Sequence, residues 1–149
     1  MAARLLSIDF GHVRIGVSIS DPMKIIASPF ATLEGAKKPV VAAKKVASQL
    51  EALLKKHSYK IEKIIIGLPI HLSGEESTRS QEVREFAKEL EVQMKTPVTF
   101  FDERLTSVQA ERSLKEAELS RKKRTTFVDA VSSTILLQCF LDLHSTPRG

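Results

Sequence analysis

Residues 61–66 are the sequence feature that most constrains the fold. The segment is nearly continuous aliphatic sequence, and Gly67-Leu68-Pro69 ends it. Such a run is typical of a parallel strand that is buried on both faces of its sheet. A parallel strand is joined to its neighbours by crossover connections, which are usually helices. The run therefore predicts an α/β fold in which helices flank the sheet.

The segments before this strand predict a hairpin, a further strand and a helix. Leu5 to Phe10 is apolar, and residues 14–20 alternate between apolar and small side chains. Because only Gly11-His12-Val13 separates these segments, we expect an antiparallel hairpin in which Gly11 adopts positive φ or lets a ligand approach the backbone. A third strand is expected near residues 27–33. From Pro39, apolar residues at steps of three and four predict a helix that covers the sheet.

The second half of the chain alternates between helix and strand patterns. A helix is expected over residues 83–94, and a strand over residues 98–101 that ends at Asp102. Thr106 and Gln109 form a capping box for a helix running to about residue 118. The last helix is expected from about Thr126, and its predicted inward positions are Val128, Val131, Ile135, Cys139 and Leu143.

This order of elements predicts the topology of the sheet. Three strands come first, and helices then alternate with two further strands joined by right-handed crossovers. We expect a five-stranded mixed sheet, with the strands in the order third, second, first, fourth, fifth and the second strand antiparallel. One domain is expected to cover residues 1–149. In open sheets of this kind, ligands bind outside the carboxyl ends of the parallel strands.

Three acidic residues lie at the ends of predicted elements. Asp9 follows the first strand, Asp102 follows the fifth, and Asp129 lies near the start of the last helix. If the first and fifth strands are parallel, Asp9 and Asp102 lie at the same edge of the sheet. Carboxylate oxygens are hard ligands that suit Mg²⁺ or Mn²⁺. The layout predicts one metal site at which Asp9, Asp102 and Asp129 converge.

Each acidic residue also has a purely structural explanation. Asp9 precedes a glycine turn and could form an Asx-turn, while Asp102 could be half of an ion pair or a helix-terminal charge, with Glu103 as the ligand in its place. Thr126 and Asp129 match a capping box, so the Asp129 carboxylate could serve only the start of the helix.

Basic residues lie close to the candidate metal site. Residues 121–124, Arg-Lys-Lys-Arg, precede Asp129, and Arg14 begins the second predicted strand. Guanidinium and ammonium groups there would hold the phosphates of a polyanion, so a phosphodiester is the expected substrate. The alternatives are a solvated loop or a localisation signal for the basic run, and an ordinary edge-strand charge for Arg14. A net charge of +5 permits nucleic-acid binding without establishing it.

Composition excludes several other classes of protein. Cys139 is the only cysteine, which rules out an internal disulfide or a thiolate metal cluster and favours a reducing compartment. The four histidines share no zinc-ligand spacing. Charge interrupts the N-terminal segment too early for a signal peptide, and no apolar run is long enough to span a bilayer. We expect a cytoplasmic protein with no membrane association.

Several blocks of residues together resemble one known family. They are Asp9-Phe10-Gly11 with Arg14-Ile15-Gly16-Val17 and Ser20-Asp21, Ile66-Gly67-Leu68-Pro69 with Gly74, Asp102-Glu103-Arg104-Leu105-Thr106, and Ser120-Arg121-Lys122-Lys123 with Val128-Asp129. Their order and spacing resemble the YqgF (RuvX) family from about residue 5 to residue 141. The resemblance implies a bacterial-type cytoplasmic nuclease of the ribonuclease-H-like superfamily. Members are associated with trimming the 5′ end of the 16S ribosomal RNA precursor, and are also described as Holliday junction resolvases.

The resemblance also implies roles for individual residues. The acidic residues of the family fall on Asp9, Asp102 and Asp129, which would hold Mg²⁺ or Mn²⁺. The implied partners are structured RNA, branched DNA or a ribosomal precursor particle, and the chain would act as a monomer or homodimer. The residue patterns and the resemblance together give these expected substrate-binding residues: Gly11, Arg14, Thr106, Arg121, Lys122, Lys123 and Arg124.

The sequence departs from related resolvases at one important position. Those proteins carry a glutamate at the end of the fourth strand, where this chain has Gly67-Leu68-Pro69. The metal site would then be thinner or would use Glu103 or Asp21. This departure leaves room for a non-catalytic nucleic-acid-binding module. A sugar-kinase or actin-like phosphate binder is the other alternative, because an Asp-x-Gly hairpin also cradles nucleotide phosphates.

Overall fold

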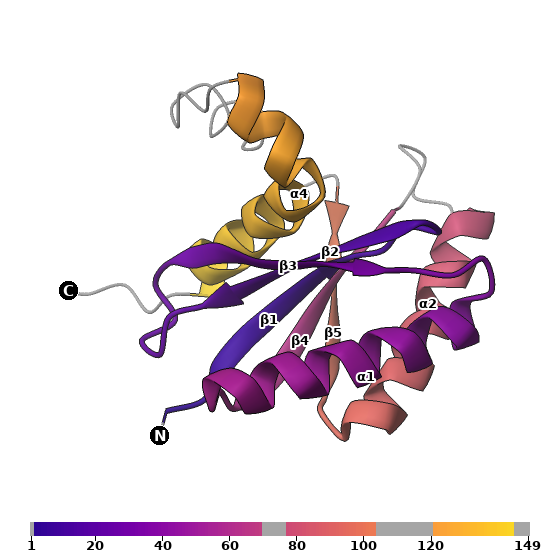
Figure 1. Ribbon diagram of the computed structural model, residues 1–149, viewed down its shortest axis with the longest axis horizontal. Coiled ribbons are helices and arrows are strands. Elements are labelled where there is room, and N and C mark those ends of the chain that lie inside the picture. The colour runs from indigo at the N-terminus through magenta and orange to yellow at the C-terminus, as the bar shows by residue number, and fades with distance from the viewer. Residues whose placement is uncertain (1, 70–76, 104–120, 145–149) are drawn as a thin grey trace.

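In a computed structural model of the chain, the described residues are 2–69, 77–103 and 121–144, and for residues 121–129 only the backbone is described. These residues form one mixed sheet of five strands with flanking helices (Figure 1). The elements are β1 (Arg4–Asp9), β2 (Arg14–Ser20), β3 (Ala27–Glu34), α1 (Pro39–His57), β4 (Ile61–Leu68), α2 (Thr78–Met94), β5 (Val98–Asp102) and α4 (Arg121–His144).

The observed strand order, β3-β2-β1-β4-β5, confirms the predicted topology. β1, β4 and β5 are parallel, and β2 is antiparallel to both of its neighbours. The carboxyl ends of β1, β4 and β5 therefore lie at one edge of the sheet. The helix predicted over residues 106–118 and the loop 70–76 lie outside the described residues.

The β1–β2 turn needs a glycine for a reason that differs from the expected one. A Cβ atom at Gly11 would lie 2.5 Å from the Arg14 carbonyl oxygen, so the chain itself leaves no room for a side chain. The φ of Gly11 lies outside the positive region, so the first of the two expected explanations is wrong, and the approach of a ligand to this backbone stays a prediction. The close approach comes from the turn backbone, which packs tightly immediately after Asp9.

The two faces of the sheet are covered by different helices. α1 and α2 pack on one face and α4 crosses the other (Figure 1). Because side chains alternate along a strand, Leu6 and Ile8 of β1 enter the core beneath α1 and α2, whereas Leu5 and Ser7 face α4. A residue's position in its strand thus decides which helix layer it meets.

Local sequence explains where α1 and α2 begin and end. Pro39 occupies the first turn of α1, and Ser58 ends this helix in the left-handed conformation at φ 57°. Ser77 caps α2 through a capping box with Ser80, whose backbone N–H donates to the Ser77 hydroxyl at 3.1 Å. The cap fixes the start of α2 beside the carboxyl edge of the sheet.

The last helix differs from its predicted start. α4 is already helical at Arg121, so residues 121–124 are not a loop preceding a helix at Thr126. Thr126 and Asp129 lie within the helix, which removes the capping-box explanation for Asp129. Cys139 is buried as predicted, but Leu143 is 64% exposed rather than inward. None of the described helices is long and apolar enough to cross a membrane.

Candidate metal and phosphate site

Asp9 and Asp102 end two parallel strands at the same edge of the sheet. Ile8 is level with Ile66, and Leu68 is level with Asp102, so the end of β4 lies between the two acidic residues. Two strand spacings place their backbones roughly 10 Å apart. Both side chains are half-buried. The predicted grouping at the carboxyl edge therefore holds for the backbone positions.

Glu103, rather than a glutamate on β4, supplies the carboxylate above the end of β4. A Cβ atom built on Gly67 would lie 2.8 Å from Glu103 Oε1 and 2.5 Å from Leu136 Cδ1. The Glu103 carboxyl and a side chain of α4 thus occupy the space that a side chain at Gly67 would need. Gly67 makes room for the Glu103 carboxyl, which arrives from the end of β5.

Strand alternation separates Asp102 from this carboxylate. Phe101 packs into the core cluster beneath α4, whereas Phe100 packs against the cluster beneath α1 and α2. Asp102 continues the alternation and so takes the side of Phe100, while Asp9 takes the side of Ser7, which faces α4. Asp9 and Glu103 therefore share the α4 face, and Asp102 borders the opposite one.

The electrostatic surroundings of Glu103 favour its protonated form. Burial raises the pKa of Glu103, the Arg79 guanidinium acts to lower it, and the neighbouring Asp102 carboxylate adds to the rise. A partly desolvated carboxyl next to another carboxylate gains most from a nearby cation. Two carboxyl groups, those of Asp102 and Glu103, therefore lie close together, and the positive charge of Arg79 partly offsets them.

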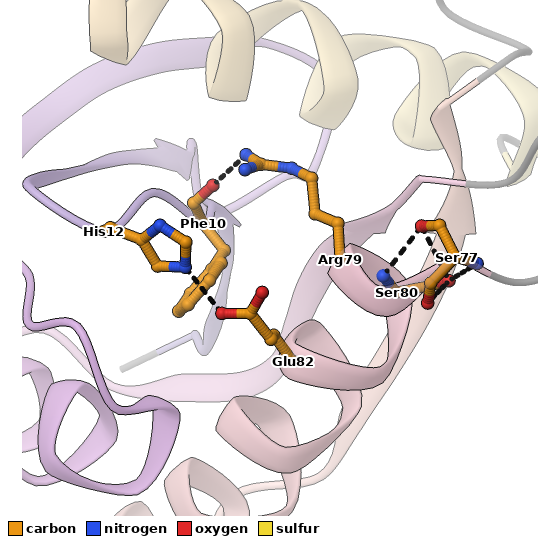
Figure 2. Close-up of polar contacts among 6 residues, drawn as sticks. All are labelled: Phe10, His12, Ser77, Arg79, Ser80 and Glu82. Carbon is orange, nitrogen blue, oxygen red and sulfur yellow. Dashed lines mark hydrogen bonds and ion pairs between the residues drawn. The ribbon is translucent and has the colours of Figure 1, made fainter.

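Arg79 is a candidate site residue that the sequence patterns did not reveal. Figure 2 shows its guanidinium reaching from the start of α2 to the β1–β2 turn, where Nη2 donates to the Phe10 carbonyl oxygen at 2.8 Å. A cation in the first turn of a helix opposes the helix dipole, which disfavours it by about 0.3–1 kcal/mol. That unfavourable placement was the available signal: helix stability does not explain Arg79, whereas a site contact does.

His12 joins the same turn to α2. Its Nε2 lies 2.5 Å from Glu82 Oε2, and its ring contacts Phe10 edge-on with centroids 5.8 Å apart (Figure 2). Phe10 in turn packs against Phe86 of α2, with centroids 4.8 Å apart. These contacts hold the backbone that follows Asp9 against α2 without involving Asp9 itself.

Hydroxyl groups fasten α4 over β1 and β2. Ser7 donates to the Ser133 carbonyl oxygen at 2.7 Å, and Ser18 lies 2.6 Å from both the Ser133 and Thr134 hydroxyls. Ser7 and Ser18 are cross-strand partners, one two-residue step from the pair formed by Asp9 and Gly16. These hydrogen bonds fix where α4 crosses β1 and β2, two residues from Asp9 on β1.

The remaining predicted residues have mixed outcomes. Arg14 is exposed at the start of β2, where it pairs across to Glu34 of the edge strand β3, so the edge-strand explanation for Arg14 is wrong. Asp21 lies at the opposite end of the sheet, where its Oδ1 accepts the backbone N–H groups of Ile25 and Ile26 at 2.7 and 2.8 Å. Asp21 therefore cannot complete the site.

Other predicted residues fall outside what the structure describes. Thr106 lies in the undescribed segment 104–120, and Asp129 and the basic run 121–124 are described only by their helical backbone. Among the side chains that are described, no three His, Cys, Asp or Glu residues form a metal-binding group. Asp9 and Glu103 nevertheless provide hard oxygen donors on one face, the donor type that Mg²⁺ and Mn²⁺ require.

Comparison with known proteins decides the family. Residues 3–143 match the profile of the RuvX family, described as Holliday junction resolvases. The chain belongs to the RuvX family. A relative from Protochlamydia amoebophila is 45% identical over 140 residues, covering 94% of this chain and 93% of that relative. One from Koribacter versatilis is 40% identical over 147 residues, covering 97% and 90%. Both RuvX relatives are named as candidate pre-16S rRNA nucleases, which are hydrolases of ester bonds.

Solved structures support the ribonuclease-H-like fold of this RuvX chain. Thermus thermophilus RuvC in complex with a Holliday junction substrate aligns with a TM-score of 0.54, covering 95% of this chain and 96% of RuvC. Sequence identity is 11%, so the likeness concerns the fold alone. The expected ribonuclease-H-like architecture is confirmed.

Proposed function

We propose that this RuvX chain is a divalent-metal-dependent nuclease that processes the 5′ end of the 16S ribosomal RNA precursor. The observation that carries the proposal is the shared position of Asp9 and Glu103 on the α4 face, on either side of Gly67. Membership in the RuvX family and the names of its relatives supply the class of reaction and the substrate.

In this proposal, Asp9, Glu103 and Asp129 hold Mg²⁺ or Mn²⁺. The helix register supports Asp129 as the third ligand. The Gln138 side chain accepts a hydrogen bond from the backbone N–H of Ala27, which is the cross-strand partner of Ser20. Ser133 contacts Ser18, which lies two residues before Ser20 on β2. Two residues earlier on β2 is Gly16, the cross-strand partner of Asp9. Two strand residues span about the length of one helical turn, so the part of α4 nearest to Asp9 is about one turn before Ser133, near residue 129.

Asp102 has a supporting role in this assignment. It adjoins Glu103 but faces the other side of the sheet, so we assign it to the electrostatics of Glu103 and not to direct ligation. The prediction from the sequence that Asp102 is itself a metal ligand stays a prediction. The two assignments differ in whether Asp102→Asn or Glu103→Gln weakens metal binding more.

The chemistry follows from charge placement. When bound, the ion supplies Lewis-acid stabilisation of the charge that develops on the phosphodiester oxygens. Arg79 has guanidinium N–H groups beyond the one that binds Phe10, and these are placed to hold a phosphate oxygen. Arg14 and the basic residues 121–124 would position the strand through phosphate contacts that carry no sequence information.

The direct test uses a 5′-extended 16S precursor RNA incubated with the full chain in Mn²⁺ or in EDTA. We expect correct 5′ shortening in Mn²⁺, none in EDTA, and loss of cleavage but not of RNA binding in Asp9→Asn. Glu85→Gln, on the exposed side of α2, is the matched control and should cleave normally. Salt-sensitive binding without cleavage under any metal condition would favour a non-catalytic binding module instead.

A second function is favoured by the description of the family. RuvX members are described as Holliday junction resolvases, which predicts cleavage of a four-way DNA junction. Resolution requires paired cuts in two strands and hence a symmetric dimer. Paired nicks in a four-way junction together with a dimer in solution would support this function over RNA trimming. A monomer that trims RNA and leaves junctions intact would exclude it.

A further inference from the structure

A cavity lies at the end of the sheet opposite the candidate metal site. It has a volume of about 360 Å³ and is lined by residues from the start of β1, the β2–β3 hairpin and the end of α1. Figure 1 shows these segments at the same end of the sheet. Its walls include Arg4, Phe30, His57 and Tyr59. Arg4 and Asp9 are the two ends of β1, so about 17 Å of strand separates this cavity from the candidate acidic residues.

Four of the residues that line the cavity carry flat π groups: Arg4, Phe30, His57 and Tyr59. The His57 and Tyr59 rings are stacked with centroids 5.2 Å apart and an interplanar angle of 15°. The Arg4 guanidinium carbon lies 4.0 Å from the centroid of the Tyr59 ring. The Phe30 and His57 rings meet edge to face, with centroids 5.8 Å apart. His57 is exposed although it belongs to this stack. Aromatic rings and a guanidinium plane are the surfaces on which unpaired bases stack.

Exposed lysines lie next in sequence to two of the wall residues, His57 and Tyr59. Lys55 and Lys56 belong to the last turn of α1 together with His57, and Lys60 follows three residues after His57. All three lysines are exposed. The acidic wall residue, Asp21, is already bound to the backbone N–H groups of the β2–β3 turn. Arg4 and Asp21 contribute opposite charges to the cavity wall, so the positive charge that would attract a phosphate comes from the nearby lysines.

We propose that this cavity binds an unpaired nucleobase, and that the nearby lysines Lys55, Lys56 and Lys60 contact the phosphate of the nucleotide. The inference rests on the proposed function only in taking a nucleic acid as the ligand. Stacking against His57 and Arg4 would hold the base, and Lys55, Lys56 and Lys60 would hold the phosphate. A mononucleotide bound here cannot reach Asp9, so the cavity is a second contact for a longer strand.

The test measures binding in EDTA, where cleavage is absent. Adenosine and uridine monophosphates are titrated into the isotopically labelled full chain, and fluorescent RNA and DNA hexamers are followed by anisotropy. We expect chemical-shift changes at residues 4, 28–30 and 55–60. We also expect hexamer affinity to fall between about fivefold and a hundredfold in His57→Ala and Arg4→Ala, as for the loss of one stacked base.

Two further variants keep the result interpretable. His57→Phe retains a ring and should bind hexamers like the wild type, and Lys44→Ala, which removes an exposed charge elsewhere on α1, should change affinity less than about twofold. Unchanged hexamer affinity in folded His57→Ala and Arg4→Ala, or shift changes confined to other surfaces, would overturn the proposal. Tighter binding of the RNA or the DNA hexamer identifies the source of the base.

The failure of this proposal is distinguishable from failure of the nuclease assignment. Asp9→Asn should bind mononucleotides at the cavity as the wild type does. If the chain cleaves RNA but the cavity variants bind normally, only the cavity proposal fails. If the cavity binds bases but no metal supports cleavage, only the nuclease proposal fails.

Discussion

The two faces of the central sheet are built from different chemistry. Beneath α1 and α2 the sheet contributes aliphatic and aromatic side chains such as Ile8 and Ile64, which pack into one continuous core. Beneath α4 the same strands carry the hydroxyls of Ser7 and Ser18 and, at the carboxyl edge, the Asp9 carboxylate. Buried hydroxyls require specific partners, whereas hydrocarbon does not. The first face supplies stability, and the second fixes the position of a site.

The largest expected effect on stability belongs to the apolar face. Phe86 is completely buried beneath α1 and α2, so Phe86→Ala should lower the free energy of unfolding by about 3–5 kcal/mol. Chemical denaturation of the purified variant measures this loss. Phe140, on the α4 face, retains 6% exposure in a smaller cluster, and Phe140→Ala should cost no more. A clearly greater loss of stability in Phe140→Ala would contradict the claim that the face beneath α1 and α2 contributes most to stability.

Gly67 tests whether the carboxyl edge is packed around Glu103. Gly67→Ala would press a methyl group against Leu136 and Glu103, and such overpacking costs about 1–3 kcal/mol. Because Leu136 and Glu103 must move, we expect the folded variant to lose cleavage activity in addition to losing stability. Denaturation and a cleavage assay on the same preparation separate the two effects. Normal activity in a destabilised variant would show that Glu103 does not act above β4.

The hydroxyl network predicts a smaller effect. Ser18→Ala removes the shared partner of Ser133 and Thr134 but leaves both able to donate to the Ala130 carbonyl oxygen. The loss should therefore be about 1 kcal/mol, that of one hydrogen bond. Ser28→Ala, at an exposed position on β3, should change stability by less than about 0.5 kcal/mol in the same denaturation experiment. Equal losses would mean that the network does not hold α4.

The smallest effect concerns pH. Because burial raises the pKa of Glu103 above 4.5, its contribution to stability is present below that value and is lost as pH rises through the raised pKa. Glu103→Gln has no such titration, so the stability of the wild type relative to this variant should fall as the pH rises above the ordinary glutamate pKa of 4.5. Glu85→Gln serves as the exposed control. A relative stability that rises with pH would contradict the direction of the shift.

Much of the fold followed from patterns that tertiary packing leaves intact. The aliphatic run of β4 and the alternation in β2 identified strands, and the order of strands and helices along the chain predicted the observed sheet with Asp9 and Asp102 at one edge. A local motif failed at α4, because the match of Thr126 and Asp129 to a capping box does not exclude helix before it.

The choice between Asp102 and Glu103 could not be made from the sequence. A shift of one residue reverses the face on which a strand side chain lies, so the exact end and register of β5 decide which carboxyl faces α4. Arg79 was also missed, because its contact with Phe10 depends on the approach of α2 to the β1–β2 turn and leaves no periodic signal.

Binding of Mn²⁺ is the measurement that tests the α4-face site most directly. Calorimetric titrations of the wild type, Glu103→Gln and Asp102→Asn use two variants that each remove one charge from adjacent residues. We predict that Glu103→Gln weakens Mn²⁺ binding much more than Asp102→Asn does, because only the Glu103 carboxylate is a direct ligand in this assignment. A greater loss in Asp102→Asn than in Glu103→Gln would contradict the assignment of the site to the face beneath α4.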